Sequence, residues 1–382
     1  MSSRLAIVTL VLCGAACSLF ADLGDLTKGE AAPSAGESDG AVADASVELS
    51  DAPALQGDAS LEGDADATPL AIQTIAQDEP GSISVAANAT DVFWVNESTH
   101  IAHSLARDGG SPQSYTPSDA GIAYLPRSVL ATNAGAVVFV PAVQPVSQSP
   151  CLTYLLNPGN GSLVCGIYDY GSIYNAAAVD TSNLYLLADD CYANEKVSCI
   201  LRQSNSATTL VGSLVWKAPY DTNNRARGPL VAEGGTLFFF TLNAGTWWLR
   251  SVPAAASNAA AAVIAQDSEA VQAMGVDSTS VYWITTVGTL RSAPRTGTAD
   301  AGIPAPFTSH TFKDPIGLAV GSKAIFVTDK TSVSAISKTD GSVTVLAEGE
   351  AAPSGITISP TSPTRVLWAN AGDGTIRSLS IP

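Results

Sequence analysis

Histidine and cysteine, the side chains best suited to bind metals or to act as nucleophiles near neutral pH, are few in this chain. It has three histidines, His100, His103 and His310, and six cysteines. His100 and His103 are three positions apart, a spacing that on a helix would let both bind one metal ion. We expect a turn leading into a strand here, and on a strand an odd spacing points side chains to opposite faces. The spacing favours solvated or hairpin histidines, and no metal is expected.

Four cysteines follow the N-terminal segment: Cys151, Cys165, Cys191 and Cys199. An even number in an exported chain favours two disulfides, for which three pairings exist. We predict local pairing, Cys151 with Cys165 and Cys191 with Cys199, because each pair flanks a turn or short loop between two expected strands. The alternative, one metal held by four thiolates, would need the two segments to meet.

The candidate ligand-binding residues are polar and lie just before, or at the start of, short apolar strands. They are Arg127, Tyr174, Asn175, Arg227, Gln272 and Asp314. None of these segments contains a histidine, and their acids, such as Glu79 and Asp314, are scattered along the chain. The sequence also has no nucleophile elbow, HExxH motif or phosphate-binding glycine loop. The pattern favours a binding site over a catalytic one, with no cofactor.

The strands that would position these residues recur at regular intervals. From residue 82 to the C-terminus, seven apolar strand centres follow one another at spacings of 41 to 53 residues. A period of about 40 to 50 residues made of strands and turns is typical of a β-propeller. The centres are Phe93, Phe139, Tyr185, Phe238, Tyr282, Phe326 and Leu367. We predict an all-β fold, a seven-bladed β-propeller of four-stranded blades. Six blades is the alternative, if the divergent second or fourth unit does not form a blade.

The two ends of the repeat region are each incomplete. The last segment, Thr375–Pro382, is a third strand with nothing after it, whereas Leu70–Ala76 precedes the first innermost strand and is similar to an outermost strand. Pairing these two segments would complete the seventh blade and leave no free sheet edge at the closure. In such a ring the loops before the innermost strands surround the axis, so the candidate residues would lie at the axial mouth.

The N-terminal 17 residues have the layout of an export signal. Arg4 is followed by the apolar run Leu5–Leu12, which is too short to span a bilayer, and then by Gly14-Ala15-Ala16 before Cys17. Small residues before a cysteine resemble the lipobox of bacterial lipoproteins, which implies that Cys17 becomes the lipid anchor. The alternative is ordinary cleavage after Ala16 and release of the protein.

Residues 18–69 differ in composition from the rest of the chain. They contain twelve acidic residues and one basic residue, Lys28, so they carry a net charge of −11 out of −17 for the whole chain. Few apolar side chains and a high net charge predict a disordered, extended tether. We therefore divide the chain into a signal segment (1–17), an acidic tether (18–69) and a propeller (70–382). No basic stripe indicates nucleic-acid binding.

Two repeat phrases carry a resemblance to known proteins. Gly275-Val276-Asp277 with Val281-Tyr282-Trp283, and Thr375–Leu379, resemble YWTD-type and NHL-like propeller repeats. Signal, tether and propeller together resemble a group of envelope lipoproteins of Gram-negative bacteria. The resemblance implies an outer-membrane, periplasmic or cell-surface location and a membrane attachment through the lipid alone.

The function expected from these features is binding or scaffolding in the cell envelope, with a protein or glycan ligand. The alternative is an exported enzyme with an axial active site, since lyases and lactonase-like hydrolases use similar rings. A purely structural role in a larger assembly is a third reading. Propeller scaffolds host unrelated functions, so the fold alone does not choose between them.

Overall fold

The computed structural model describes residues 71–116, 128–133, 135–139, 151–159, 161–168, 173–189, 191, 196–204, 213–219, 224–297, 301–361 and 363–381. All of these belong to one compact unit, Pro69–Pro382. The predicted signal segment, Cys17 and the predicted tether lie outside the described residues. The described elements are 27 strands, which pair antiparallel within seven sheets.

Each sheet is one blade, and its strands follow the chain from the innermost to the outermost position. Blade 1 contains β2 (Ser82–Ala87), β3 (Asp91–Asn96), β4 (Ile101–Ala106) and β5 (Gln113–Tyr115). Blade 2 contains β6 (Ser128–Thr132), β7 (Gly135–Phe139), β8 (Cys151–Asn157) and β9 (Ser162–Tyr168). Blade 3 contains β10 (Ile173–Val179), β11 (Asn183–Asp189), β12 (Val197–Ser204) and β13 (Ser213–Pro219). Blade 4 contains β14 (Asn224–Glu233), β15 (Thr236–Asn243), β16 (Thr246–Pro253) and β17 (Ala262–Asp267).

The last three blades follow the same order, with one irregular member and one composite member. Blade 5 contains β18 (Val271–Val276), β19 (Ser280–Thr285) and β20 (Leu290–Pro294). Blade 6 contains β21 (Gly317–Val320), β22 (Ala324–Thr328), β23 (Ser332–Ser337) and β24 (Val343–Glu348). Blade 7 contains β25 (Pro353–Ile358), β26 (Arg365–Asn370), β27 (Thr375–Ser380) and, outermost, β1 (Ile72–Ala76).

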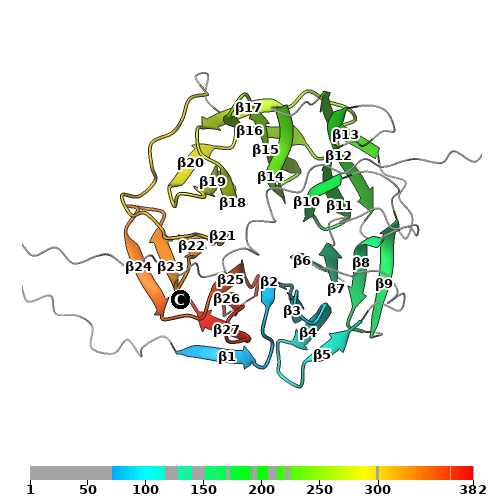
Figure 1. Cartoon of the computed structure of the whole chain (residues 1–382), viewed down its shortest axis with the longest axis vertical. Helices are drawn as coiled ribbons and strands as arrows, with labels where there is room; N and C mark the ends of the chain where they lie inside the picture. The colour runs from blue at the N-terminus through cyan, green and yellow to red at the C-terminus, as the bar shows by residue number, and fades with distance from the viewer. Residues whose placement is uncertain are drawn as a thin grey trace, which may run out of the picture. The chain divides into compact units, whose positions relative to one another are not determined.

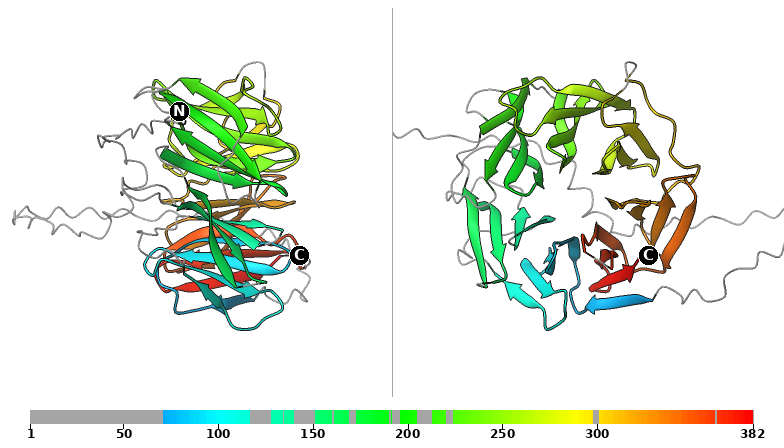
Figure 2. Two further views of the ribbon diagram at one scale, coloured as in Figure 1. Left: turned by 90° about the vertical axis from the view of Figure 1, so that its right-hand side faces the viewer. Right: turned by 180° about the vertical axis from the view of Figure 1, so that it is seen from behind.

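The seven blades form a ring, as predicted (Figure 1). The first and last strands of the unit lie side by side, and the register pairs Ile72 with Leu379 and Gln73 with Ser378. Figure 2 shows the same neighbouring strands from behind, in blue and red. The predicted closure of the seventh blade by an N-terminal strand is therefore confirmed.

Blade 5 departs from the four-stranded pattern among the described residues. Its fourth position is taken by an irregular segment that makes a single antiparallel bridge, Arg291 to Pro306. The Phe307 amide also donates to the Leu290 carbonyl at 2.7 Å. Pro304 and Pro306 lack an N–H group and cannot extend a ladder of hydrogen bonds, which accounts for the missing strand.

The apolar core consists of seven separate clusters, one at each junction between neighbouring blades. The second strand of each blade supplies residues to both of its junctions, because successive side chains point to opposite faces. On β15, for example, Phe239 packs toward blade 3 whereas Phe238 and Phe240 pack toward blade 5. This explains why these strands are apolar without alternation.

A glycine allows the innermost strands of blades 7 and 1 to approach closely. A Cβ atom on Gly355 of β25 would lie 2.7 Å from the Ser84 Cα of β2, which is too close for any other residue without a shift of the backbone. The Ser354 hydroxyl also donates to the Ser82 carbonyl at 2.8 Å. The ring therefore closes by backbone contact at its centre as well as by strand pairing at its rim.

Blade 7 contains a polar triad of Glu350, Trp368 and Arg377, with Asn370 as a further partner of the buried acid. The Glu350 carboxylate, just before β25, accepts hydrogen bonds from the Trp368 indole at 2.9 Å and from the Asn370 amide at 2.6 Å. Its other oxygen lies 2.7 Å from the Arg377 guanidinium. Trp368 and Arg377 are cross-strand partners on β26 and β27, so the acid ties the start of the blade to its second and third strands.

Blade 5 repeats this triad with an aspartate. The Asp267 carboxylate accepts a hydrogen bond from the Trp283 indole at 2.7 Å and lies 3.0 Å from the Arg291 Nε. Trp283 and Arg291 are again cross-strand partners. Because Asp267 ends the last strand of blade 4, its triad joins two blades.

Candidate ligand-binding site between blades 3 and 4

A cavity of about 250 Å³ opens between blades 3 and 4, where β13 ends and β14 begins. It lies on the same face of the ring as the predicted ligand-binding loops, but between two blades instead of at the axial mouth. The described residues that line it include two arginines and no acid. They are Ser198, Trp216, Ala218, Pro219, Arg225, Ala226, Thr241, Leu242, Asn243 and Arg250.

Arg250 is the main polar group of this cavity. Its Nε donates to the Thr241 hydroxyl at 2.8 Å, which fixes the guanidinium, and no described residue accepts from its two terminal nitrogens. Burial lowers the pKa of Arg250. Arginine nevertheless stays charged at neutral pH, so the cavity presents a partly desolvated cation with free donors.

Two further arginines add to the positive charge. Arg225 lines the cavity, and the next residue but one on β14 is Arg227, one of the sequence-predicted candidates. Burial lowers the pKa of Arg227, and the charge of Arg225 lowers it further, whereas Asp189 acts in the opposite direction. An anionic ligand would relieve this repulsion between like charges.

The indole of Trp216 forms an apolar wall of the cavity. It is 5% exposed and its ring lies 4.7 Å from that of Phe239, centroid to centroid. A flat apolar wall beside fixed cationic and hydroxyl donors is a common composition for a site that binds a small polar group.

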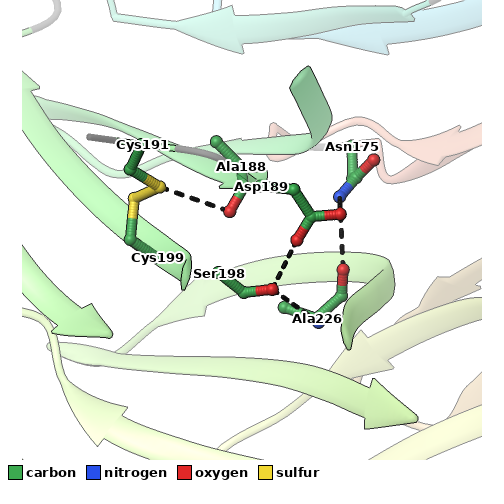
Figure 3. Close-up of a disulfide and its surroundings, with 7 residues drawn as sticks. All are labelled: Asn175, Ala188, Asp189, Cys191, Ser198, Cys199 and Ala226. Atoms are coloured by element: carbon green, nitrogen blue, oxygen red, sulfur yellow. Dashed lines mark hydrogen bonds between the residues drawn. A yellow bond between two sulfur atoms is a disulfide. The ribbon is translucent and has the colours of Figure 1, made fainter. Parts of the chain in front are cut away.

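A buried hydrogen-bond network holds the two blades together at the edge of the cavity (Figure 3). The Ser198 hydroxyl donates to the Asp189 carboxylate and accepts the Ala226 N–H at 3.1 Å. The Asn175 amide donates to the same carboxylate and to the Ala226 carbonyl, each at 3.2 Å. Ser198 and Ala226 both line the cavity, so the network fixes the edge at which the two blades meet.

The disulfide between Cys191 and Cys199 braces this edge (Figure 3). It spans a sequence separation of 8 residues, as the sequence predicted, and Cys199 is adjacent to Ser198 on β12. The side chains of Cys151 and Cys165 lie outside the described residues. Their backbones form part of β8 and β9, where the register places Cys165 opposite Tyr154, and their pairing stays a prediction.

The other predicted ligand-binding residues are not brought to this cavity. Gln272 is on β18, and Asp314 is two-thirds exposed, in a left-handed backbone conformation with its carboxylate 3.8 Å from the Lys330 Nζ. Arg127 and the Tyr174 side chain lie outside the described residues. Among the described candidates, no hydrogen bond or ion pair joins one to another.

His103 lies in the β3–β4 hairpin, as expected, but the expectation that it could be solvated was wrong, because its side chain is buried. It is 4% exposed on β4, its ring stacks on Trp94 at 5.2 Å, and its Nε2 lies 3.2 Å from the Glu79 carboxylate. Burial lowers the pKa of His103 to about 4, and burial raises the pKa of Glu79. Blade 1 therefore has the same arrangement as blades 5 and 7 with a histidine in the cationic position.

Sequence reasoning missed the cavity and the triads, although one signal for the triads was present. An acid stands before the innermost strand, a tryptophan at or after the centre of the second strand, and a basic residue opposite it on the third. The cavity had no such signal, because Arg250 and Thr241 resemble any polar residues of a β-strand.

The described residues offer little else for chemistry. They contain no cluster of three or more histidine, cysteine or acidic side chains able to hold a metal ion. In the same part of the chain, no helix is long and apolar enough to cross a membrane.

The fold and cavity define a β-propeller protein, and comparison of structures agrees. The β-propeller domain of Cps50 (Swd1) from Myceliophteria thermophila aligns with a TM-score of 0.56 at 11% identity over 82% of this chain and 100% of that one. U3-55K gives a TM-score of 0.58 at 8% identity over the same shares. The computationally designed Ika8 protein gives 0.52 at 11% identity over 81% of this chain and 98% of its own.

These similarities establish the fold alone. No protein-family model matches the sequence, and no curated protein matches it.

Proposed function

We propose that this chain is an exported binding module that captures a carboxylate-bearing ligand in the cavity between blades 3 and 4. The observation that carries the proposal is the fixed guanidinium of Arg250, which has free donors inside a cavity that lacks acidic residues among those described. A guanidinium can bind a carboxylate through two parallel hydrogen bonds. Its partial burial strengthens that bond relative to one in water.

Export and lipid attachment are part of the same proposal. The signal-like segment before Cys17 supports export, and so does the Cys191–Cys199 disulfide, since disulfides persist mainly in oxidising compartments. We propose attachment through a lipid on Cys17 in a Gram-negative envelope, with the acidic residues 18–69 as a tether. The propeller would then present its cavity to a protein or glycan partner outside the cytoplasm.

The binding proposal is tested by calorimetric titration of the full mature chain with an oligoglutamate peptide and with an oligogalacturonate. Arg250→Gln and Asn243→Ala should each weaken binding, the former by about tenfold or more because it removes a charge-assisted contact. Arg202→Gln is the matched control, since Arg202 donates to Ser213 and to the Ala254 carbonyl away from the cavity. Binding of neither probe, or an equal loss in the control, would overturn the proposal.

The anchoring proposal has a separate test. Expressed in a Gram-negative host, the chain should partition into the membrane and detergent fractions, whereas Cys17→Ser should release it or leave it unprocessed. A wild-type chain found only in the soluble fraction would contradict lipid attachment and leave the cavity proposal intact.

A further inference from the structure

Three blades carry a basic residue just after the third strand, and its side chain reaches the turn between the first two strands of the preceding blade. Lys338 of blade 6 donates to the Asp277 carboxylate of blade 5 at 2.5 Å. Arg295 of blade 5 donates to the Glu233 carbonyl of blade 4 at 2.7 Å and to the Asp277 carbonyl at 3.0 Å. In both places a protein acceptor satisfies the cation.

The third of these residues, Arg107 of blade 1, meets a different environment. Its Nη1 donates to the Thr361 hydroxyl of blade 7 and, at 3.5 Å, to the Asn88 carbonyl. The turn in blade 7 offers a second cation, Arg365, instead of an acid. The Ser359 amide donates to the Arg365 carbonyl at 2.8 Å, and the Ser359 hydroxyl lies 3.5 Å from the Thr361 hydroxyl, so Arg365 begins the strand beside the turn that Arg107 reaches. Consistent with this position, burial lowers the pKa of Arg107 and the charge of Arg365 lowers it further.

Arg365 is not satisfied by the protein. Its Nε is buried and has no hydrogen-bond partner. No ion pair involving Arg107 or Arg365 occurs among the described residues. At the equivalent turn of blade 5 the first residue is Asp277, whereas in blade 7 it is Ser359. At the junction of blades 7 and 1 the basic residue therefore meets a second arginine, whereas at the junction of blades 5 and 6 it meets the Asp277 carboxylate.

We propose that a phosphate group binds between Arg107 and Arg365, with the Thr361 hydroxyl as a further contact. A phosphate monoester carries about −1.5 to −2 charges at neutral pH and balances two guanidinium groups, whereas a carboxylate would balance only one. Arginine forks also match the oxygens of a phosphate. This site lies on the face opposite the cavity between blades 3 and 4, and it does not depend on the function proposed for that cavity.

A free phosphate ester and a phospholipid head group share this chemistry. The site faces the same side of the ring as the start of β1, where the chain enters the propeller, and the Ile381 amide beside it donates to the Thr364 carbonyl. Two probes distinguish these ligands. Inorganic phosphate represents a free phosphate ester, and vesicles with and without phosphatidic acid represent a lipid head group.

The experiment measures phosphate binding to the full mature chain by calorimetry at constant ionic strength, and vesicle binding by co-sedimentation. Arg365→Gln should weaken binding of whichever probe binds by about tenfold or more, the effect of losing one charge-assisted contact. Arg107→Gln should do the same independently. Lys323→Gln removes one exposed charge from the same face and should leave affinity within about twofold, as expected for general screening.

The outcomes are distinct. Loss of phosphate binding in both arginine variants supports a site for free phosphate esters, and loss of vesicle binding supports a lipid head group. Binding of neither probe overturns the proposal, and so does an equal loss in Lys323→Gln.

Discussion

Blades 1 and 7 are neighbours at the closure of the ring and use one arrangement with different chemistry. In blade 7 a buried carboxylate, Glu350, is paired with a permanent cation and accepts the indole N–H of Trp368. In blade 1 the equivalent acid, Glu79, faces His103, and the histidine ring stacks on Trp94. The two triads differ in the basic side chain that faces the acid, a guanidinium in blade 7 and an imidazole in blade 1.

The difference follows from the identity of one side chain. Arg377 reaches past the apolar surface and keeps 27% of its side chain exposed, whereas the shorter His103 is 5% exposed and stacks on the indole. A histidine in that position loses hydration without gaining a full counter-charge, so its neutral form is favoured. Blade 7 is therefore held by electrostatics and blade 1 mainly by stacking.

Removal of the acid from each blade should give the largest contrast. Glu350→Ala removes the partner of two buried N–H donors and the buried one of the two carboxylates that pair with Arg377, and should lower the free energy of unfolding by about 3 kcal/mol. Glu79→Ala should cost only about 1 kcal/mol, because its partner is neutral. Urea unfolding followed by tryptophan fluorescence measures both, and equal losses would show that the two triads do not differ in kind.

The second-largest effect on stability is expected from acidification, through blade 1. The pKa of His103 is about 4 in the folded chain and about 6.5 when unfolded, so between these values only the unfolded chain binds the proton and stability falls as the pH falls. The loss should reach about 2–3 kcal/mol by pH 4 and then level off. The raised pKa of Glu79 opposes part of it, since the folded chain takes up that proton first.

The variant His103→Gln checks this assignment. It removes the titrating ring but keeps a polar side chain near Glu79 and Ser114, the groups that face His103. Its stability should fall less than that of the wild type as the pH falls from 6.5 to 4, because only the contribution of His103 is removed. A variant that keeps the wild-type slope would assign the titration to other groups.

The smallest effect is expected from removing the exposed ion pair that Arg377 of the blade 7 triad makes with Asp373. Arg377 also lies 3.3 Å from Asp373, a pair at the surface of the β26–β27 turn. Asp373→Ala should lower the free energy of unfolding by less than about 1 kcal/mol, because water and salt screen the exposed ion pair and the other bonds lost are exposed ones from Thr375. The same unfolding assay compares this variant with Glu350→Ala. If Asp373→Ala lost as much stability as Glu350→Ala, burial of the carboxylate would not explain the difference between the two acids.

Much of the fold could be predicted because each blade repeats the same order of strands and turns, which makes the sequence periodic. The apolar strand centres gave seven blades, and the incomplete ends gave the pairing of β1 with β27. The irregular edge of blade 5 was not foreseen, although Pro304 and Pro306 were visible as residues that cannot extend a strand ladder.

The candidate site was harder to predict because it depends on side-chain direction across two blades. The sequence pointed to the face of the ring on which this cavity opens, and Asn175 and Arg227 lie near the cavity. Arg250 was not singled out, since only the register that places it opposite Phe239, which packs toward blade 3, shows that Arg250 points toward that blade. His103 was misjudged because the spacing from His100 says nothing of Glu79, which lies 24 positions earlier in the chain.

The closing strand β1 has a mechanical consequence. Any tension transmitted through the residues that precede Ile72 acts on a five-residue strand, whose neighbour in the sheet, β27, belongs to the far end of the chain. Such a load would peel the strand away one backbone pair at a time, beginning at Ile72 and Leu379, before it stretched any other blade. The rim of blade 7 is thus the point at which pulling would open the circle.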